Sequence, residues 1–302
     1  MLSCDVLSKR SGTARGLVLN AAAKVNLTLE VLGRRNDGYH EIVTVMQTVD
    51  LSDRLVVEDA DVLELRTTAP DMPTDGTNLA LRAAGALRDR AAVNRGARIT
   101  LEKRIPVAAG LGGGSADAAA VLVGLNRLWG LRWSTARLAE VAVTLGMDVP
   151  FFLYGGAALG TGRGERLEPL PTCALALVLV NPRVAASTAE IYGGVKPDMY
   201  SDGGRGRGMA VALRSRQPSR VAAKLGNALE RVAAPRYRDV EQIESALQAA
   251  GALGAAMSGS GLTVFGVARS YDHARQIRDR IGRARWACWA VRALRGPAIR
   301  IR

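Results

Sequence analysis

The stretch PVAAGLGGGSADAAA, residues 106–120, constrains the fold of this chain more than any other part of the sequence. Four of the five residues from Gly110 to Gly114 are glycine, so the backbone there can adopt positive φ angles and let a ligand approach its N–H groups closely. The apolar run that follows predicts a helix over residues 115–129. Because the unpaired amides and the dipole of a helix N-terminus attract anions, the stretch predicts a phosphate-binding loop. A flexible glycine loop that leads into a core helix is the alternative.

This loop differs from the two commonest phosphate-binding motifs. No lysine follows the last glycine, as the Walker pattern requires, and Ser115 stands where the dinucleotide-binding fingerprint has its third glycine. We expect Gly112 and Gly113 to tolerate no side chain, because a Cβ would both disfavour the backbone angles of the loop and take the space of a phosphate oxygen. A second glycine stretch, MSGSG at residues 257–261, offers another backbone segment that could approach a phosphate.

The length of 302 residues, 48% of them hydrophobic, predicts two domains with sizeable cores. The longest aliphatic run, residues 174–180, is far shorter than the roughly 20 residues that cross a bilayer. Residues 1–16 contain no apolar core of signal-peptide length and are expected to form a flexible N-terminal tail. We therefore expect a cytoplasmic protein without a membrane partner.

Residues that bind transition metals are scarce in this chain. The three cysteines and two histidines are too few and too scattered for a zinc site, so a hard cation such as Mg²⁺, held by oxygen atoms and substrate phosphates, is the metal to expect. The 41 Lys and Arg against 28 Asp and Glu give a net charge of +13, which favours anionic partners. Basic and aromatic residues do not interleave as on single-strand binding surfaces, so no nucleic-acid partner is expected.

Hydrophobic periodicity predicts an α+β chain. Alternation over residues 17–32 predicts a half-buried strand whose polar face carries Lys24, Asn26, Thr28 and Glu30. Further strands are expected at 42–49, 54–58, 62–67, 97–103, 174–180, 262–268 and 286–294. Further helices are expected at 78–90 after Asn78 as cap, from the cap Ser134 to Gly146, and at 221–234, 240–250 and 271–281. Residues 165–172 are expected to form a boundary, and residues 197–220, rich in Gly, Arg and Ser, a mobile loop without a site.

Two charged residues lie in unusual settings. Asp148, in GMDVPFFLYGG, lies between a helix end and Pro150 among apolar residues, where a carboxylate is costly to bury unless it is paired. It could instead cap the following turn. Lys24, taken alone, could be a solvated strand lysine.

Three separated stretches, AAAKVNLTLEVLGRRNDGYHE, PVAAGLGGGSADAA and MSGSG, resemble in order and spacing the three motifs of the GHMP kinase superfamily, small-molecule kinases with a non-Walker phosphate loop. KVNLTLEVLGRRNDGYHE and LGMDVPFFLYGGAALGTGRGE are most similar to the members that phosphorylate a methylerythritol linked to cytidine diphosphate, in the non-mevalonate isoprenoid pathway. The resemblance implies the two-domain GHMP kinase fold, with the active site between the domains. Residues 17–168 would form an ATP-binding domain like ribosomal-protein-S5 domain 2, and residues 169–302 a ferredoxin-like domain.

The resemblance also implies roles for individual residues. Lys24 and Asp148 would be the catalytic pair, with Asp148 as the base for the acceptor's 2-hydroxyl and Lys24 as the cation that orients it. The ATP phosphate loop would comprise Pro106, Val107, Ala108, Ala109, Gly110, Leu111, Gly112, Gly113, Gly114, Ser115 and Ala116. The substrate side would comprise Asn26, Tyr39, His40, Thr188, Tyr192, Gly259, Ser260 and Gly261, with cytosine stacked between Tyr39 and Tyr192. Ala116 stands where many members have a second serine, which leaves Ser115 as the hydroxyl for Mg²⁺.

The chemistry of phosphoryl transfer accounts for these residue types. The reaction needs the phosphate charge neutralised and a hydroxyl held in line, which a glycine loop, a helix N-terminus, Mg²⁺ and one lysine supply. Two other interpretations stay open: a GHMP kinase for homoserine, mevalonate or a sugar, and a basic RNA-binding protein on an S5-like domain. The stretches DGYH and MDVPFF argue against the first. The pair Lys24 and Asp148, for which RNA binding has no use, argues against the second.

Overall fold

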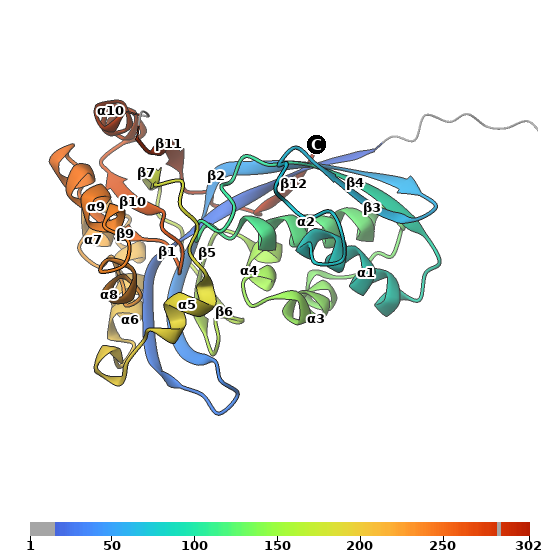
Figure 1. The fold of residues 1–302 in the computed structure, drawn as a ribbon, viewed down its shortest axis with the longest axis horizontal. Coiled ribbons are helices and arrows are strands. Elements are labelled where there is room, and N and C mark those ends of the chain that lie inside the picture. Colours follow the sequence, from blue (N-terminus) through green and yellow to red (C-terminus); the bar gives the residue numbers. More distant parts are fainter. Residues whose placement is uncertain (1–15, 283–284) are drawn as a thin grey trace, which may run out of the picture.

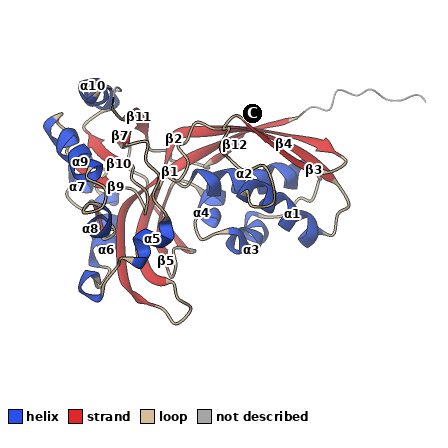
Figure 2. Cartoon of the chain, viewed as in Figure 1, coloured by secondary structure: helices blue, strands red, loops and turns tan. Residues whose placement is uncertain are grey.

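The computed structural model describes residues 16–282 and 285–302 and folds them into two β-sheets with packed helices (Figures 1 and 2). Nearly all of the expected N-terminal tail, residues 1–15, lies outside the described residues. The strands are β1 (Leu17–Arg34), β2 (His40–Ala60), β3 (Leu63–Thr67), β4 (Gly96–Glu102), β5 (Ala157–Thr161), β6 (Arg166–Leu170), β7 (Ala176–Asn181), β8 (Gly226–Asn227), β9 (Gly254–Met257), β10 (Val264–Ala268), β11 (Ala287–Arg292) and β12 (Ile299–Ile301). The helices are α1 (Leu79–Ala91), α2 (Gly113–Leu128), α3 (Thr135–Leu145), α4 (Val149–Tyr154), α5 (Thr188–Gly193), α6 (Gly204–Arg214), α7 (Pro218–Ala222), α8 (Glu230–Ala233), α9 (Asp239–Ala249) and α10 (Tyr271–Ile281), with a 3₁₀ turn at Pro197–Met199. The expected α+β class is confirmed.

The larger sheet has the strand order β12-β1-β2-β4-β3, with β5 paired to β2, β6 paired to β5 and β8 paired to β1. The smaller sheet has the order β11-β7-β10-β9. Helices α1 to α4 gather on one side of the larger sheet, and α9 and α10 lie beside the smaller one (Figure 2). A shared apolar core joins the two sheets, since Val25 and Leu27 of β1 pack in the same cluster as Leu177 and Phe265 of the smaller sheet.

Strand β1 is buried on both faces where it passes between the two sheets. Every residue from Ala21 to Val31 is at most 7% exposed. The expectation of a half-buried strand with a solvated polar face is therefore wrong. Other segments cover that face, because Ser258 contacts the backbone of Asn26 and the start of α6 contacts Glu30.

The two strands expected at 42–49 and 54–58 are one continuous strand, β2, which pairs antiparallel with β1 along most of its length. The register between β1 and β2 shifts between Ala22 and Lys24 and again between Asn26 and Thr28. Such irregularities increase the local twist and re-aim side chains. They bracket Lys24 and Asn26, the two residues of β1 that the sequence singled out.

Helix α2 begins at Gly113, two residues earlier than expected, and its N-cap Gly112 has a φ of 69°. Its small residues let it approach the sheet closely: a Cβ on Gly124 would lie 3.2 Å from a methyl carbon of Leu19. Asn78 and Ser134 cap α1 and α3 through their side chains, as expected. The packing of α2 fixes the end of the glycine loop against the larger sheet.

Residues 197–220 contain helix α6 and the start of α7, so the expectation of a mobile loop is wrong. The first turn of α6 is held by the buried carboxylate of Glu30, which accepts hydrogen bonds from the Gly206 amide at 2.7 Å and the Ser201 hydroxyl at 2.9 Å. Met209 and Leu213 pack in the core. Glycine lowers helix propensity, and the anion that caps this helix lies far away in the sequence, so the local pattern concealed it.

The helix expected over 221–234 is also wrong, because strand β8 separates α7 from α8. The short strands β8, β9 and β12 were not predicted, because two to four residues are too few to show the alternation of apolar and polar side chains that indicates a strand. Strand β12 pairs with β1, with Ile301 opposite Leu19, so the end of the chain returns to the larger sheet. Strand β6 runs across the expected division between residues 168 and 169, and the domain limits stay a prediction.

Candidate active site

A cavity of about 980 Å³ collects most of the residues that the sequence nominated. The nominated residues on its wall are Lys24, Asn26, Tyr39, His40, Pro106, Val107, Ala108, Ala109, Gly110, Gly112, Gly113, Gly114, Ser115, Asp148, Thr188, Tyr192, Gly259 and Ser260. Leu111, Ala116 and Gly261 are buried behind the wall. The tertiary structure therefore brings together segments that are more than 200 residues apart in the sequence.

Lys24 lies on the cavity wall with its side chain almost fully buried, so it is not a solvated strand lysine. Its ammonium donates to Asn26 Oδ1 at 2.6 Å and to the Gly110 carbonyl at 3.1 Å. The same nitrogen lies 3.4 Å from Asp148 Oδ2. Asn26 is itself fixed, because its amide nitrogen donates to the Thr44 hydroxyl at 2.8 Å. These contacts orient the lysine toward Asp148.

The three motif stretches meet at the carbonyl of Gly110. This oxygen accepts from Lys24 and, at 2.9 Å, from the hydroxyl of Ser258. The Ser258 oxygen also accepts the Asn26 amide at 3.2 Å. Asn227 holds the MSGSG turn by donating to the carbonyls of Met257 and Gly259. Ser258, Thr44 and Asn227 were missed; only Ser258 lay inside a recognised motif.

Asp148 lies at the N-cap position of α4, but its side chain makes no capping hydrogen bond. Its side chain is 36% exposed and reaches the cavity. The carboxylate is therefore paired with Lys24, as expected, and only partly buried, whereas the alternative that it serves as a helix cap is wrong. The apolar residues that follow it are buried in the core beneath, while the carboxylate faces outward.

The glycine loop that was expected to bind phosphate adopts the backbone geometry that glycine permits. Gly110 and Gly112 have φ angles of 76° and 69°. A Cβ on Gly112 would lie 2.7 Å from the ring of Phe152, and one on Gly113 would lie 3.0 Å from Ile105. The expected conformational reason is confirmed for Gly112, whose φ is positive, but not for Gly113. The expectation that a Cβ would take the space of a phosphate oxygen is wrong for both, since both Cβ positions point at protein atoms. Gly114 is different, because nothing lies within 4 Å of its Cβ position and the residue lines the cavity.

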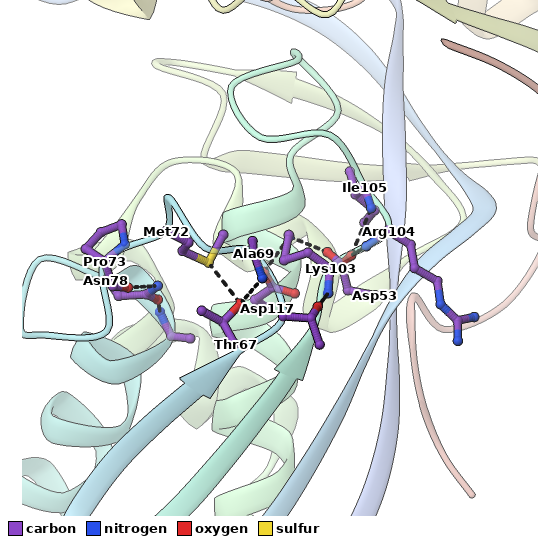
Figure 3. A network of polar contacts seen from close by, with 12 residues as sticks. Asp53, Thr67, Ala69, Met72, Pro73, Asn78, Lys103, Arg104, Ile105 and Asp117 are labelled. Carbon is purple, nitrogen blue, oxygen red and sulfur yellow. Dashed lines mark hydrogen bonds and ion pairs between the residues drawn. The ribbon is translucent and has the colours of Figure 1, made fainter. Parts of the chain in front are cut away.

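A buried ion cluster lies directly under the loop (Figure 3). The ammonium of Lys103 pairs with Asp53 and, at 2.8 Å, with Asp117 Oδ2. Burial raises the pKa of the Asp117 carboxyl to about 7, against the opposing effect of Lys103. No sequence pattern pointed to Asp53 or Lys103: Asp53 lies between the two strands that periodicity predicts within β2, and Lys103 follows the end of β4.

The aromatic residues of the substrate side form a different arrangement from the expected sandwich. The rings of His40 and Tyr192 stack on each other with centroids 5.5 Å apart and an interplanar angle of 29°. This separation is typical of direct ring stacking and leaves no space for a base between them. Tyr39 is 53% exposed, and the guanidinium of Arg163 lies 5.0 Å from its ring centroid. The stacking of cytosine between Tyr39 and Tyr192 stays a prediction.

The surroundings perturb two of these groups. Burial, with a smaller effect of Arg34, lowers the pKa of His40, which favours the neutral imidazole. Burial raises the pKa of the Tyr192 phenol, and the charge of Asp148 adds to that shift. On the same side, the hydroxyls of Thr188 and Ser260 are 2.7 Å apart, which confirms that these two nominated residues lie together.

Four cations line the cavity: Lys24, Arg34, Lys103 and Arg163. Both lysines are committed to carboxylates, and Arg163 lies 3.8 Å from Glu165. Arg34 is exposed and has no ion-pair partner within residues 16–282 and 285–302. Arg34 and Arg163 were not nominated by the sequence, although both lie within the quoted motifs.

The described residues contain no group of three or more His, Cys, Asp and Glu that could hold a metal ion. They also contain no helix long and apolar enough to cross a membrane. A hydroxyl and a carboxylate, Ser115 and Asp148, are nonetheless on the cavity wall. Mg²⁺ typically takes only one or two protein ligands beside substrate phosphates, so this donor set fits that ion.

Both halves of the chain match models of known protein domains. The model of the GHMP kinases N terminal domain matches residues 78–156, and that of the GHMP kinases C terminal domain matches residues 209–288. A protein of Pelotomaculum thermopropionicum named 4-diphosphocytidyl-2-C-methyl-D-erythritol kinase is 50% identical over 266 residues, which cover 87% of this chain and 93% of that protein. A protein of the same name from Symbiobacterium thermophilum is 46% identical over 284 residues, which cover 90% and 98%.

Solved structures give the same result at the level of the fold. A crystal structure of 4-(cytidine 5'-diphospho)-2C-methyl-D-erythritol kinase has a TM-score of 0.79 and 39% identity, and covers 91% of this chain and 98% of that chain. A homoserine kinase from Cytophaga hutchinsonii has a TM-score of 0.75 at 19% identity and covers 97% and 99%. The second likeness concerns the fold alone.

Proposed function

The chain belongs to the 4-diphosphocytidyl-2-C-methyl-D-erythritol kinases of the GHMP kinase superfamily, and from this premise we propose how its residues carry out the reaction. It is an ATP-dependent kinase that phosphorylates 4-diphosphocytidyl-2-C-methyl-D-erythritol in the non-mevalonate isoprenoid pathway. The expected GHMP kinase fold is confirmed. The observation that carries the mechanism is the meeting of the three motif stretches at Gly110, beside the ion pair of Lys24 and Asp148.

Asp148 is the general base for the 2-hydroxyl of the acceptor. Its carboxylate faces the cavity, and its 3.4 Å separation from Lys24 is longer than a strong charge-assisted hydrogen bond. One carboxylate oxygen can therefore accept the hydroxyl proton while Lys24 stabilises the orientation of the group. The other contacts of Lys24, to Asn26 and Gly110, fix the lysine from behind.

The phosphates of ATP bind along the glycine loop and the N-terminus of α2. The positive φ angles of Gly110 and Gly112 turn the backbone into this loop, and Gly114 leaves open space in front of it. Ser115 would contribute a hydroxyl ligand to Mg²⁺. When bound, the ion supplies charge neutralisation on the phosphates. The chain's own amides and the helix dipole stabilise the same charge.

The acceptor binds at the end of the cavity that carries Tyr39, His40 and Tyr192. Its diphosphate needs a cation, and Arg34 is the one on the wall that no carboxylate neutralises within the described residues. Tyr39 presents an exposed ring on which cytosine can stack. The guanidinium of Arg163 contacts the same ring and helps to hold it in place. We also propose that the enzyme is cytoplasmic, where ATP is present.

An ADP-release assay tests the function directly. The purified chain is given ATP and Mg²⁺ with 4-diphosphocytidyl-2-C-methyl-D-erythritol, homoserine, mevalonate or galactose, beside a salt-dependent titration with RNA. We expect turnover with the first substrate alone and only weak, salt-sensitive RNA binding. Turnover with homoserine, mevalonate or galactose contradicts the proposal. The absence of turnover with all four substrates, together with tight RNA binding, also contradicts it.

A further inference from the structure

Three charged side chains from three different elements meet beneath the phosphate loop (Figure 3). Asp53 belongs to β2, Lys103 follows β4, and Asp117 lies in α2; their side chains are 0%, 6% and 2% exposed. One ammonium therefore binds two carboxylates that water does not reach. The mechanism proposed above assigns no role to this cluster.

The cluster fixes the backbone at the entry of the loop. The second carboxylate oxygen of Asp53 accepts the amides of Arg104 at 2.6 Å and Ile105 at 2.9 Å. These are the last two residues before Pro106, where the loop begins. A single carboxylate thus determines the direction in which the chain leaves β4.

The same cluster fixes the exit of the loop. Asp117 lies in the second turn of α2, and Lys103 binds it at 2.8 Å. The ammonium lies under the first residue of that helix, since a Cβ on Gly113 would lie 3.2 Å from Lys103 Nζ. Both flanks of the loop are therefore tied to one nitrogen atom.

Stability alone does not account for this arrangement. Burying charges costs desolvation energy, and apolar side chains of similar volume commonly stabilise a protein as well or better. The second oxygen of Asp117 has no hydrogen-bond partner within the described residues, which adds to the cost of burying this carboxylate. Unlike apolar contacts, the ion pairs and hydrogen bonds of charged groups are directional. Each of these contacts therefore orients one specific backbone segment.

We propose that Lys103, with Asp53 and Asp117, is a positioning group for ATP: it sets the distance and orientation between the two flanks of the phosphate loop. This proposal rests on the proposed function only in taking the loop as the ATP site. Displacing binding groups by about 1 Å can cost up to a hundredfold, so we expect losses of about ten- to a hundredfold in ATP affinity. Acceptor binding should not change.

The decisive variant is Asp117→Asn, because two explanations predict opposite signs for it. If the cluster acted on ATP through its charge, removing a carboxylate near a polyanion would tighten binding. If the cluster positions the loop, the loss of the ion pair weakens binding. Calorimetry with the unreactive analogue AMP-PNP and Mg²⁺, without acceptor, measures this sign directly.

Three further variants complete the experiment. Lys103→Met keeps the stem and removes the charge, and Lys103→Arg restores a cation and should recover part of the affinity. Arg54→Gln is the matched control, since Arg54 and Glu102 are the sequence neighbours of Asp53 and Lys103 and form a partly exposed ion pair. The control should bind AMP-PNP like the parent protein.

Steady-state kinetics separate positioning from general damage. We expect the KM for ATP to rise in Asp117→Asn and Lys103→Met while the KM for the acceptor stays within about twofold, as expected when only one binding step is affected. Tighter or unchanged AMP-PNP binding in a folded Asp117→Asn overturns the proposal, as does an equal rise in both KM values. If Lys103→Met does not fold, Asp117→Asn decides alone. A parent protein that binds no AMP-PNP would instead contradict the proposed function.

Discussion

At the scale of single residues, the proposed mechanism depends on how Lys24 is held. A lysine on a buried strand would be strongly destabilising without partners. Here Asn26, Gly110 and Asp148 surround its ammonium, one from the same strand, one from the phosphate loop and one from the N-cap of α4. The lysine therefore connects the proposed base, Asp148, to the loop proposed to bind phosphate.

Replacing Asp148 with Asn should remove the base and keep the shape of the site. We expect kcat to fall about 10²- to 10⁴-fold, the usual contribution of general-base catalysis, while both KM values change little. Lys24→Ala should cost a similar factor. The measurement is steady-state kinetics of both single variants and the double variant.

The double variant tests whether the two residues act as one unit. We expect it to lose much less activity than the product of the two single losses, because coupled groups are not additive. A fully multiplicative loss in the double variant would show that Lys24 does not act through Asp148. A loss of less than about threefold in kcat for Asp148→Asn is too small for general-base catalysis and would contradict that role.

Arg34 provides a second prediction at this scale. Arg34→Gln should raise the KM for the acceptor about tenfold or more, the effect of losing a hydrogen bond to a charged group, and leave the KM for ATP unchanged. Competition by CDP and by cytidine isolates the diphosphate, since the preference for CDP should shrink in the variant. Arg35→Gln is the control, because Arg35 lies on the same turn but pairs with Asp37 and Glu41. If Arg34→Gln kept the parent protein's preference for CDP over cytidine, Arg34 would not bind the diphosphate.

At the scale of elements, the phosphate loop and α2 work as one unit. The loop's glycines serve two purposes: Gly110 and Gly112 have positive φ angles, whereas Gly113 lacks a side chain because Ile105 and Lys103 lie against it. A Val at Gly113 would therefore damage the fold beneath the loop. It is a poor probe of the phosphate site.

Gly114→Val is the better probe. Its Cβ would extend into open space on the cavity side, so we expect the melting temperature to change little and the affinity for AMP-PNP to fall about tenfold or more. Gly85→Val is the control, since Gly85 lies in α1 with equally open space around its Cβ and away from the cavity. Equal nucleotide affinity in the two variants would exclude Gly114 from the phosphate site.

At the scale of the whole molecule, the two ends of the described chain share one sheet. Strand β12 pairs with β1, and Ala298 accepts a hydrogen bond from the Ala22 amide at 3.0 Å. Ala298 and Ile299 are buried in the same core as α2. The C-terminal residues therefore support the strand that carries Lys24.

Removing residues 298–302 should lower the melting temperature by about 5 °C or more, given the loss of a buried isoleucine and a strand edge. Removing Arg302 alone should lower the melting temperature much less, because its side chain is exposed and it contributes a single backbone hydrogen bond, from its amide to the Val18 carbonyl. Differential scanning calorimetry with and without ATP measures both. A melting temperature unchanged by the longer truncation would show that β12 contributes nothing to the sheet.

The elements with strong local signals, and the motifs on which the proposed chemistry depends, can be predicted from the sequence. Helices α1, α3, α9 and α10 lie where hydrophobic periodicity predicts them, α1 and α3 also with the expected caps Asn78 and Ser134, because these signals lie within or next to each helix. The glycine loop before α2 was equally local. Lys24 and Asp148 were nominated by the resemblance of their motifs, and the ion pair between them is present.

Which side chains are buried, and which groups they pack against, depends on the tertiary structure. It turned the polar face of β1 inward, formed α6 on the carboxylate of Glu30, and stacked Tyr192 on His40. It also assembled the cluster of Lys103 with Asp53 and Asp117 from three elements. Each of these features depends on residues that are far apart in the sequence. A local sequence pattern gives the residue type at a position but does not indicate which group will pack against it.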